Sequence, residues 1–224
     1  MSILSNLDLI RRVPLFSMLT PPQIESLAQA VSKKRLKRGE ILVGQGENRN
    51  ALYILLTGHT RVVVTDSKGR EVILATLHSG DCVGEMSLID GEPHSATVVA
   101  DVDVDVLILG RDDFLRCLSE SPAMCFAVMH ELVQRLRKAG QNISSLALMG
   151  VYGRVAKVLL DSAVVDEEGA LITRDKVSRQ NLAKMVGASR EMVSRVMKDF
   201  EEQGFIRSLE GGMVRVYERR VLPR

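Results

Sequence analysis

Residues 178–200, SRQNLAKMVGASREMVSRVMKDF, decide how this chain folds. They read as two short helices that are separated at Gly187, with Ser178 and Ser189 as the residues that cap each helix. At about 100° per residue, the apolar and the charged side chains of residues 189–200 fall on opposite arcs. The apolar arc consists of Met192, Val193, Val196, Met197 and Phe200. This pattern predicts a helix whose apolar side packs on a core.

The polar arc of the second helix carries Arg190, Glu191 and Arg195. On an ordinary surface helix these residues would be solvated charges. Here they follow a first helix and a glycine-containing turn, which is how a helix-turn-helix presents side chains to the major groove. Arginine can donate two hydrogen bonds to the O6/N7 edge of guanine, and glutamate can accept one from the cytosine amino group. We therefore predict that this unit binds double-stranded DNA.

The residues after the second helix predict a β-hairpin. Residues 205–207 and 213–217 are short apolar runs on either side of Gly211 and Gly212. Two short strands around a Gly-Gly turn form a hairpin, so we expect the wing of a winged helix. From residue 152 onward the chain carries 14 Lys and Arg against 11 Asp and Glu, an excess of three cations, while the whole chain has a net charge of only +2. DNA affinity must then come from the placement of the cations and from a doubled site.

The composition indicates a soluble, cytoplasmic, two-domain protein. The chain has 224 residues, of which 46% are hydrophobic, which suffices for two cores. Its three cysteines form no C-x-x-C pair, so neither a disulfide framework nor a zinc site is expected. Charged residues interrupt the N-terminal apolar residues, and no apolar run reaches the roughly 18 residues of a membrane span. A nucleophile elbow and a phosphate-binding G-x-x-x-x-G-K-[ST] motif are also missing, so we do not expect an enzyme.

Short β-type runs separated by turn residues follow an N-terminal segment, residues 7–34, that reads as helical. Strands with turn signals about every 8–12 residues predict a small all-β sandwich or barrel. The expected strands are residues 41–43, 51–56, 61–65, 72–77, 95–100 and 102–109.

A long helix is expected from Pro122 to about Met149, before Gly150. Apolar residues step along it by three and four alternately, as in the a/d seam of a coiled coil. A helix that is packed only on its own domain is the alternative, but one small barrel would cover this seam poorly. We therefore predict a parallel two-fold dimer. The seam residues are Met129, Leu132, Leu136, Ala139, Ile143 and Leu146.

Residues 84–97, GEMSLIDGEPHSAT, form a loop with two glycines, an early Glu and a late Ser-Ala-Thr. Backbone N–H groups at such a turn can hold a phosphate, and the Glu85 carboxylate could accept from a ribose hydroxyl. Taken alone, the loop could equally be an ordinary surface loop.

Together these parts resemble the CRP/FNR family of bacterial transcription regulators over nearly the whole chain. The strings that carry the resemblance are G-E-x-S-L…S-A-T and V-S-R-Q-N-L-A-K-M-V-G-A-S-R-E-M-V-S-R. The resemblance implies that Arg190, Glu191 and Arg195 read bases in an inverted repeat of TGTGA-like half-sites. It further implies RNA polymerase as a partner and assigns contacts with phosphates to Ser178, Arg179, Gln180 and Ser189.

The resemblance also outlines an effector pocket, but several of its polar anchors are changed. In cyclic-AMP binders the position of His94 is an arginine that pairs with the cyclic phosphate. A neutral imidazole lacks the permanent charge and the paired donors of a guanidinium group. Ala139 and Gly140 stand where two hydroxyl residues meet the adenine. We therefore expect weak cyclic-AMP binding and leave open cyclic di-GMP, another small molecule or no effector at all. The pocket would comprise Gly84, Glu85, Met86, Ser87, His94, Ser95, Ala139 and Gly140.

The expected fold class is α+β, with a β-roll like that of cyclic-nucleotide-binding domains at residues 1–121. A dimerisation helix with a hinge follows at 122–150, and a winged helix-turn-helix at 151–224. The predicted function is a homodimeric transcription regulator that a nucleotide second messenger controls, with no metal and no certain cofactor. The alternatives are a cyclic-nucleotide-sensing module that regulates a protein partner and a DNA-binding regulator that no effector controls.

Overall fold

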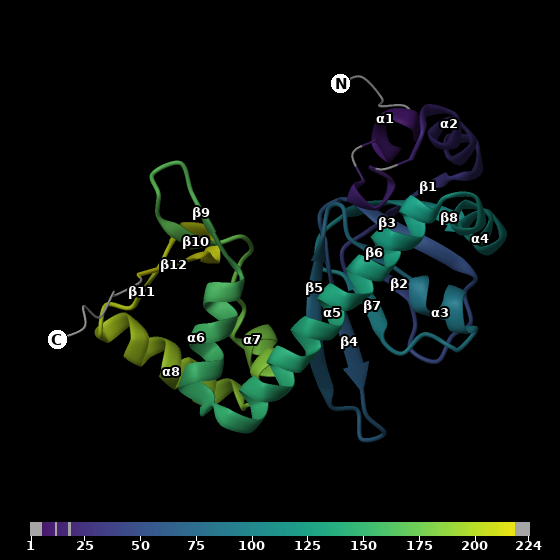
Figure 1. Cartoon of the computed structure of the whole chain (residues 1–224). Coiled ribbons are helices and arrows are strands. Elements are labelled where there is room, and N and C mark those ends of the chain that lie inside the picture. Colours follow the sequence, from purple (N-terminus) through teal and green to yellow (C-terminus); the bar gives the residue numbers. More distant parts are fainter. Residues whose placement is uncertain (1–5, 12, 18, 218–224) are drawn as a thin grey trace. The chain divides into compact units, whose positions relative to one another are not determined.

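The computed structural model describes residues 6–11, 13–17 and 19–217 (Figure 1). Its contacts divide the chain into two compact units, Met1–Leu136 and Arg137–Arg224. The boundary falls inside helix α5, Pro122–Leu148, which closely matches the long helix expected from the sequence. Among the described helices, none combines the length and the apolar composition that crossing a bilayer requires.

The first unit begins with three short helical segments, α1 (Asn6–Ile10), η1 (Pro14–Phe16) and α2 (Pro21–Ala30). Thr20 and Gln23 form a capping box at the start of α2. The expectation of helix up to residue 34 is wrong, because the backbone becomes extended at Val31 and strand β1 runs from Ser32 to Leu36. Strand β1 forms because it pairs antiparallel with strand β8 (Val104–Gly110). A pattern of apolar residues within one segment cannot reveal pairing with a strand that is distant in the sequence.

Two four-stranded antiparallel sheets form the β-roll. One sheet has the order β1-β8-β3-β6 and the other the order β2-β7-β4-β5. The expected strands are all present, together with β1 and the short β6. Helices α3 (Glu85–Asp90) and α4 (Arg111–Glu120) complete the unit. The remaining strands are β2 (Ile41–Val43), β3 (Ala51–Thr57), β4 (His59–Thr65), β5 (Glu71–His78), β6 (Cys82–Val83) and β7 (Thr97–Ala100).

Strand β3 contributes side chains to both hydrophobic cores of the first unit. Its alternating side chains point to opposite faces of the sheet. Tyr53 and Leu55 lie in the core between the two sheets, whereas Leu52 and Ile54 join the core that the flanking helices cover. Both faces of β3 are therefore buried, which explains its continuous apolar run.

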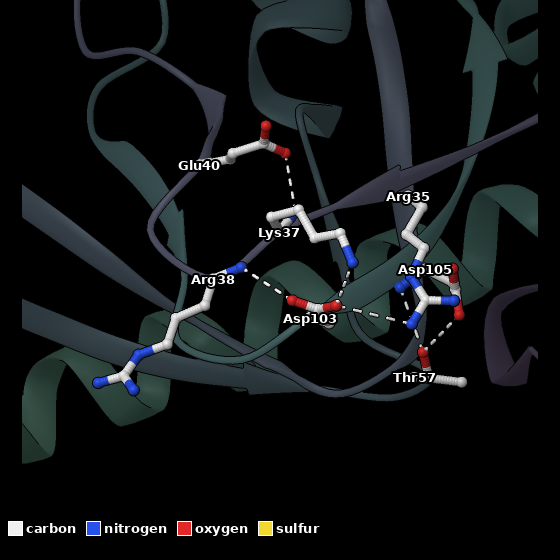
Figure 2. Close-up of polar contacts among 7 residues, drawn as sticks. All are labelled: Arg35, Lys37, Arg38, Glu40, Thr57, Asp103 and Asp105. Atoms are coloured by element: carbon white, nitrogen blue, oxygen red, sulfur yellow. Dashed lines mark hydrogen bonds and ion pairs between the residues drawn. The ribbon is translucent and has the colours of Figure 1, made fainter.

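A charged cluster holds the end of β1 to the turn before β8 (Figure 2). The Asp103 carboxylate accepts hydrogen bonds from Lys37 Nζ at 2.8 Å and from the Arg38 backbone N–H at 3.1 Å. The Lys37 hydrogen bond is the main reason why the pKa of Asp103 lies below its usual value. Arg35 adds longer ion pairs with Asp103 and Asp105, at 3.7 and 3.9 Å. These contacts explain how a strongly basic run, residues 33–38, can serve as a sheet edge.

The second unit contains the C-terminal part of α5 and a separate core. The sequence predicts the first helix of the DNA-binding unit over residues 152–165. Helix α6 runs from Val151 to Asp161, and the backbone then forms strand β9, Ala163–Val165, so the predicted end of this helix is wrong. Residues 163–165 are extended because they pair with β10, Leu171–Thr173, in a four-stranded sheet with the order β11-β12-β10-β9. The expected hairpin is present as β11 (Ile206–Ser208) and β12 (Val214–Val216).

Candidate DNA-binding helix and effector loop

Helices α7 (Arg179–Val186) and α8 (Arg190–Glu202) form the predicted helix-turn-helix. The Ser178 hydroxyl accepts from the Asn181 N–H at 3.4 Å, and the Ser189 hydroxyl accepts from the Met192 N–H at 3.2 Å. Gly187 lies between the helices at φ 64°, ψ 49°, a left-handed conformation that favours glycine. Both caps and the break at Gly187 are thus where the sequence predicted them.

The apolar face of α8 fixes which side chains point outward. Val193, Val196 and Met197 are fully buried in the core of the second unit. Met192 is the exception to the predicted arc, because 36% of its surface is exposed at the edge of the buried stripe. A helix anchored along one whole face cannot rotate, so its opposite face has a fixed direction.

The opposite face of α8 exposes Arg190, Glu191 and Arg195. Neither arginine forms an ion pair with any residue that the structure describes, so both guanidinium groups are free to meet a ligand. Its own backbone N–H and the Ser189 hydroxyl lower the pKa of Glu191, so this carboxylate is an acceptor at neutral pH. The face therefore offers two planar donors and one acceptor. These groups are complementary to base edges in the major groove, where guanine presents acceptors and cytosine presents a donor.

The four residues predicted to contact phosphates lie at the N-termini of these two helices. Ser178 and Ser189 are the caps, Arg179 begins α7, and Gln180 is exposed beside it. Helix N-termini offer unpaired N–H groups and a positive dipole end to anions. This position agrees with a phosphate contact, which remains a prediction.

The effector loop in the first unit centres on a buried ion pair. Gly84 has φ 100° and starts α3, and Glu85 directly after it is only 3% exposed. Arg135 on α5 donates to Glu85 Oε1 at 2.7 Å and to the Cys82 carbonyl. Burial raises the pKa of Glu85, while the Arg135 charge opposes that rise. Arg135 was not predicted as a site residue, because an arginine on a long helix looks like a solvated charge.

His94 is the second buried polar group of the loop, with 5% of its surface exposed. Its Nδ1 lies 3.0 Å from the Ser87 hydroxyl. Burial lowers the pKa of His94, and the charge of Arg49 lowers it further. The imidazole is therefore neutral at neutral pH, as expected for a position that cannot supply a fixed charge.

Comparison with known proteins assigns both units. Residues 33–121 match the family described as the cyclic nucleotide-binding domain, and residues 153–224 match the Crp-like helix-turn-helix domain. A CRP-like cAMP-activated global transcriptional regulator of Mycobacterium tuberculosis is 30% identical over 220 residues, which cover 97% of this chain and 98% of that protein. The chain belongs to the CRP/FNR family of transcription regulators.

A second relative and one solved structure are also similar to this chain. The cAMP-activated global transcriptional regulator CRP of Salmonella typhimurium is 30% identical over 207 residues, covering 90% of this chain and 97% of its own. The structure of the c-di-GMP responsive global regulator CLP of Xanthomonas campestris has the same fold, with a TM-score of 0.75 and 24% identity over 89% of this chain and 100% of that chain. The present CRP/FNR protein is thus a DNA-binding transcription regulator with an N-terminal cyclic nucleotide-binding domain.

The structure brings only part of the predicted effector set together in this CRP/FNR protein. Gly84, Glu85, Ser87 and His94 lie on one loop with buried polar groups. The side chains of Met86 and Ser95 are exposed, the former by 50%. Ala139 and Gly140 are exposed on the part of α5 that belongs to the second unit. Their role in an effector pocket stays a prediction.

Replacing Gly84 with Ala is expected to destabilise the first unit by about 2 kcal/mol or more, because a side chain there is strained and crowded. A Cβ would stand 2.4 Å from the Ala51 carbonyl oxygen, and the φ of 100° disfavours any side chain. Gly91→Ala is the matched control, since φ is 78° but no atom lies within 4 Å of a Cβ. Urea unfolding of both variants measures the difference; equal losses of stability would contradict the close approach at Ala51.

Proposed function

We propose that the protein is a homodimer that binds an inverted repeat of TGTGA-like half-sites and regulates transcription there by contact with RNA polymerase. The observation that carries the proposal is the exposed triad of Arg190, Glu191 and Arg195 on a helix whose other face is buried. The triad lies within the S-R-E-x-V-x-R string of residues 189–195, on which the resemblance to the CRP/FNR family rests. Two arginines and one glutamate suit a half-site with two guanines and one cytosine.

The support for a dimer comes from apolar side chains on α5. Met129, Leu136, Ile143 and Leu146 are exposed by 49, 73, 67 and 53%, respectively. Of the other two residues of the predicted dimer seam, Ala139 is exposed and Leu132 packs partly on the core of the first unit. A stripe of large apolar side chains in water favours association with a second copy. Two copies would place two recognition helices about one DNA turn, roughly 34 Å, apart.

The effector of this regulator is proposed to be a cyclic nucleotide or a cyclic dinucleotide. The cyclic nucleotide-binding domain supports the class of ligand. Curated relatives are named for activation by cAMP, and the structural neighbour CLP is named for its response to c-di-GMP. His94 in place of an arginine argues against tight binding of cyclic AMP by the common mode. The ligand would change the population of states around residues 148–151, where Gly150 separates α5 from α6.

DNase footprinting on an inverted TGTGA-type repeat tests this function. The experiment has four conditions: cyclic AMP, cyclic GMP, cyclic di-GMP and no nucleotide. We expect protection of both half-sites under at least one of them. Each nucleotide is added separately, so that the titration also identifies the effector. A complete lack of protection under all four conditions would contradict the proposed function.

A further inference from the structure

The loop between β2 and β3, residues 44–50, is tied to His94 by its backbone. The His94 N–H donates to the Glu47 carbonyl at 3.0 Å, and the Gly46 N–H donates to the His94 carbonyl at 2.8 Å. These two hydrogen bonds join segments that are almost fifty residues apart in the sequence. The neighbourhood of His94 therefore includes the side chains of that loop.

Arg49 is the cation that this loop contributes. The Glu47 carboxylate accepts from Arg49 Nε at 2.9 Å, which fixes the plane of the guanidinium group. The Tyr53 hydroxyl also contributes to raising the pKa of Arg49, and the Tyr53 ring lies 3.6 Å from the site of a Cβ on Gly84. Arg49 is close enough to His94 to lower the pKa of the imidazole. Its side chain is 43% exposed, so it remains open to a solute.

His94 itself carries an unused polar atom. Its Nε2 is buried and has no hydrogen-bond partner among the described residues. When the Ser87 hydroxyl donates to Nδ1, the proton of the neutral ring stays on Nε2, which is then a donor. A buried donor without a partner costs free energy, because it has lost its hydrogen bond to water. A ligand acceptor at this position would remove that cost.

We propose that Arg49, together with the His94 Nε2–H group, binds the cyclic phosphodiester of the effector. Arg49 would supply the charge that an arginine at position 94 supplies in cyclic-AMP binders, and His94 would supply one neutral hydrogen bond. Glu85, with its second carboxylate oxygen buried and unpartnered among the described residues, is the acceptor expected for a ribose hydroxyl. The assignment rests on the proposed function, because it presumes a cyclic nucleotide or dinucleotide as the effector.

Calorimetric titration of the full-length protein with cyclic AMP, cyclic GMP and cyclic di-GMP tests the assignment. Arg49→Ala should weaken binding of the effective nucleotide by about 10- to 100-fold, the loss typical of one hydrogen-bonded charge. Arg49→Lys should bind with intermediate affinity, since it keeps the charge and loses the fork. Arg116→Ala is the matched control, because Arg116 is also a half-exposed arginine paired with a nearby carboxylate, Asp113, but lies on α4.

The outcomes separate this assignment from the proposed function. Thermal unfolding of Arg49→Ala without nucleotide should match that of the wild type, which excludes a loss by misfolding. Equal affinities of Arg49→Ala and wild type would overturn the role of Arg49, and so would a wild-type protein that takes up none of the three nucleotides. DNA protection on the inverted repeat is measured independently, so the regulator function can stand even when the phosphate assignment fails.

Discussion

A protein with both Arg190→Ala and Arg195→Ala is expected to bind the inverted repeat about a thousandfold or more weakly than the wild type. Each arginine–guanine pair contributes about 1–3 kcal/mol of discrimination, and a dimer uses every pair twice. The loss ends at the non-specific level, which typically lies 10³- to 10⁷-fold below specific binding. Because both side chains are exposed, the fold should be unaffected. Fluorescence anisotropy at one fixed salt concentration measures the change.

Lys198→Ala is the control for this experiment. Lys198 lies on the same exposed face of α8, in a later turn, and pairs with Glu202 at 3.6 Å. Its removal should weaken binding to all sequences alike, as loss of a general positive charge does. If the double arginine variant still prefers the repeat over a scrambled duplex by the wild-type ratio, α8 does not read bases.

The second large effect is expected at the dimer seam. Leu136→Glu combined with Ile143→Glu should convert the proposed dimer into folded monomers. Burying one leucine or isoleucine side chain contributes about 1.5–3 kcal/mol, and the two positions occur twice in a dimer. The monomer–dimer dissociation constant should therefore rise by roughly four orders of magnitude or more. Sedimentation velocity measures the change, and the affinity for the inverted repeat should fall with it.

Val165→Glu is the control for the seam variant. Val165 is 67% exposed, close to the values of Leu136 and Ile143, but it lies on β9 outside α5. The substitution should leave the dimer intact, since it adds the same charge elsewhere. A seam variant that sediments like the wild type would show that α5 does not hold two copies together.

The parts with a strong local pattern were predictable from the sequence. The helix-turn-helix has serines at both caps, a glycine that takes φ 64°, and an apolar arc that, apart from Met192, matches the core. The long helix has proline at its start and glycine after its end, and its observed bounds, Pro122–Leu148, follow these residues. Each signal involves residues that are close together in the sequence, so these elements can be predicted without knowledge of tertiary contacts.

The parts set by distant contacts were not predictable. Strand β1 carries Lys33, Lys34 and Arg35, which show no apolar alternation, and it forms because β8 pairs with it. Arg135 lies 50 residues from Glu85 in the sequence and meets it only in the folded unit. The loop that carries Arg49 is likewise joined to His94 by backbone hydrogen bonds of Gly46 and Glu47, almost fifty residues away in the sequence. The effector site was therefore outlined by resemblance, whereas the residues around its buried groups became visible only in the structure.

Methylation interference on the inverted repeat is the most direct test that α8 reads DNA in two copies. Methylation of guanine N7 blocks the edge to which a guanidinium group donates. If α8 reads bases as proposed, methylation of the half-site guanines abolishes wild-type binding in both halves of the repeat. The Arg190→Ala and Arg195→Ala proteins should each lose this sensitivity at one guanine per half-site. Wild-type binding that tolerates methylation of every half-site guanine would contradict base reading by α8.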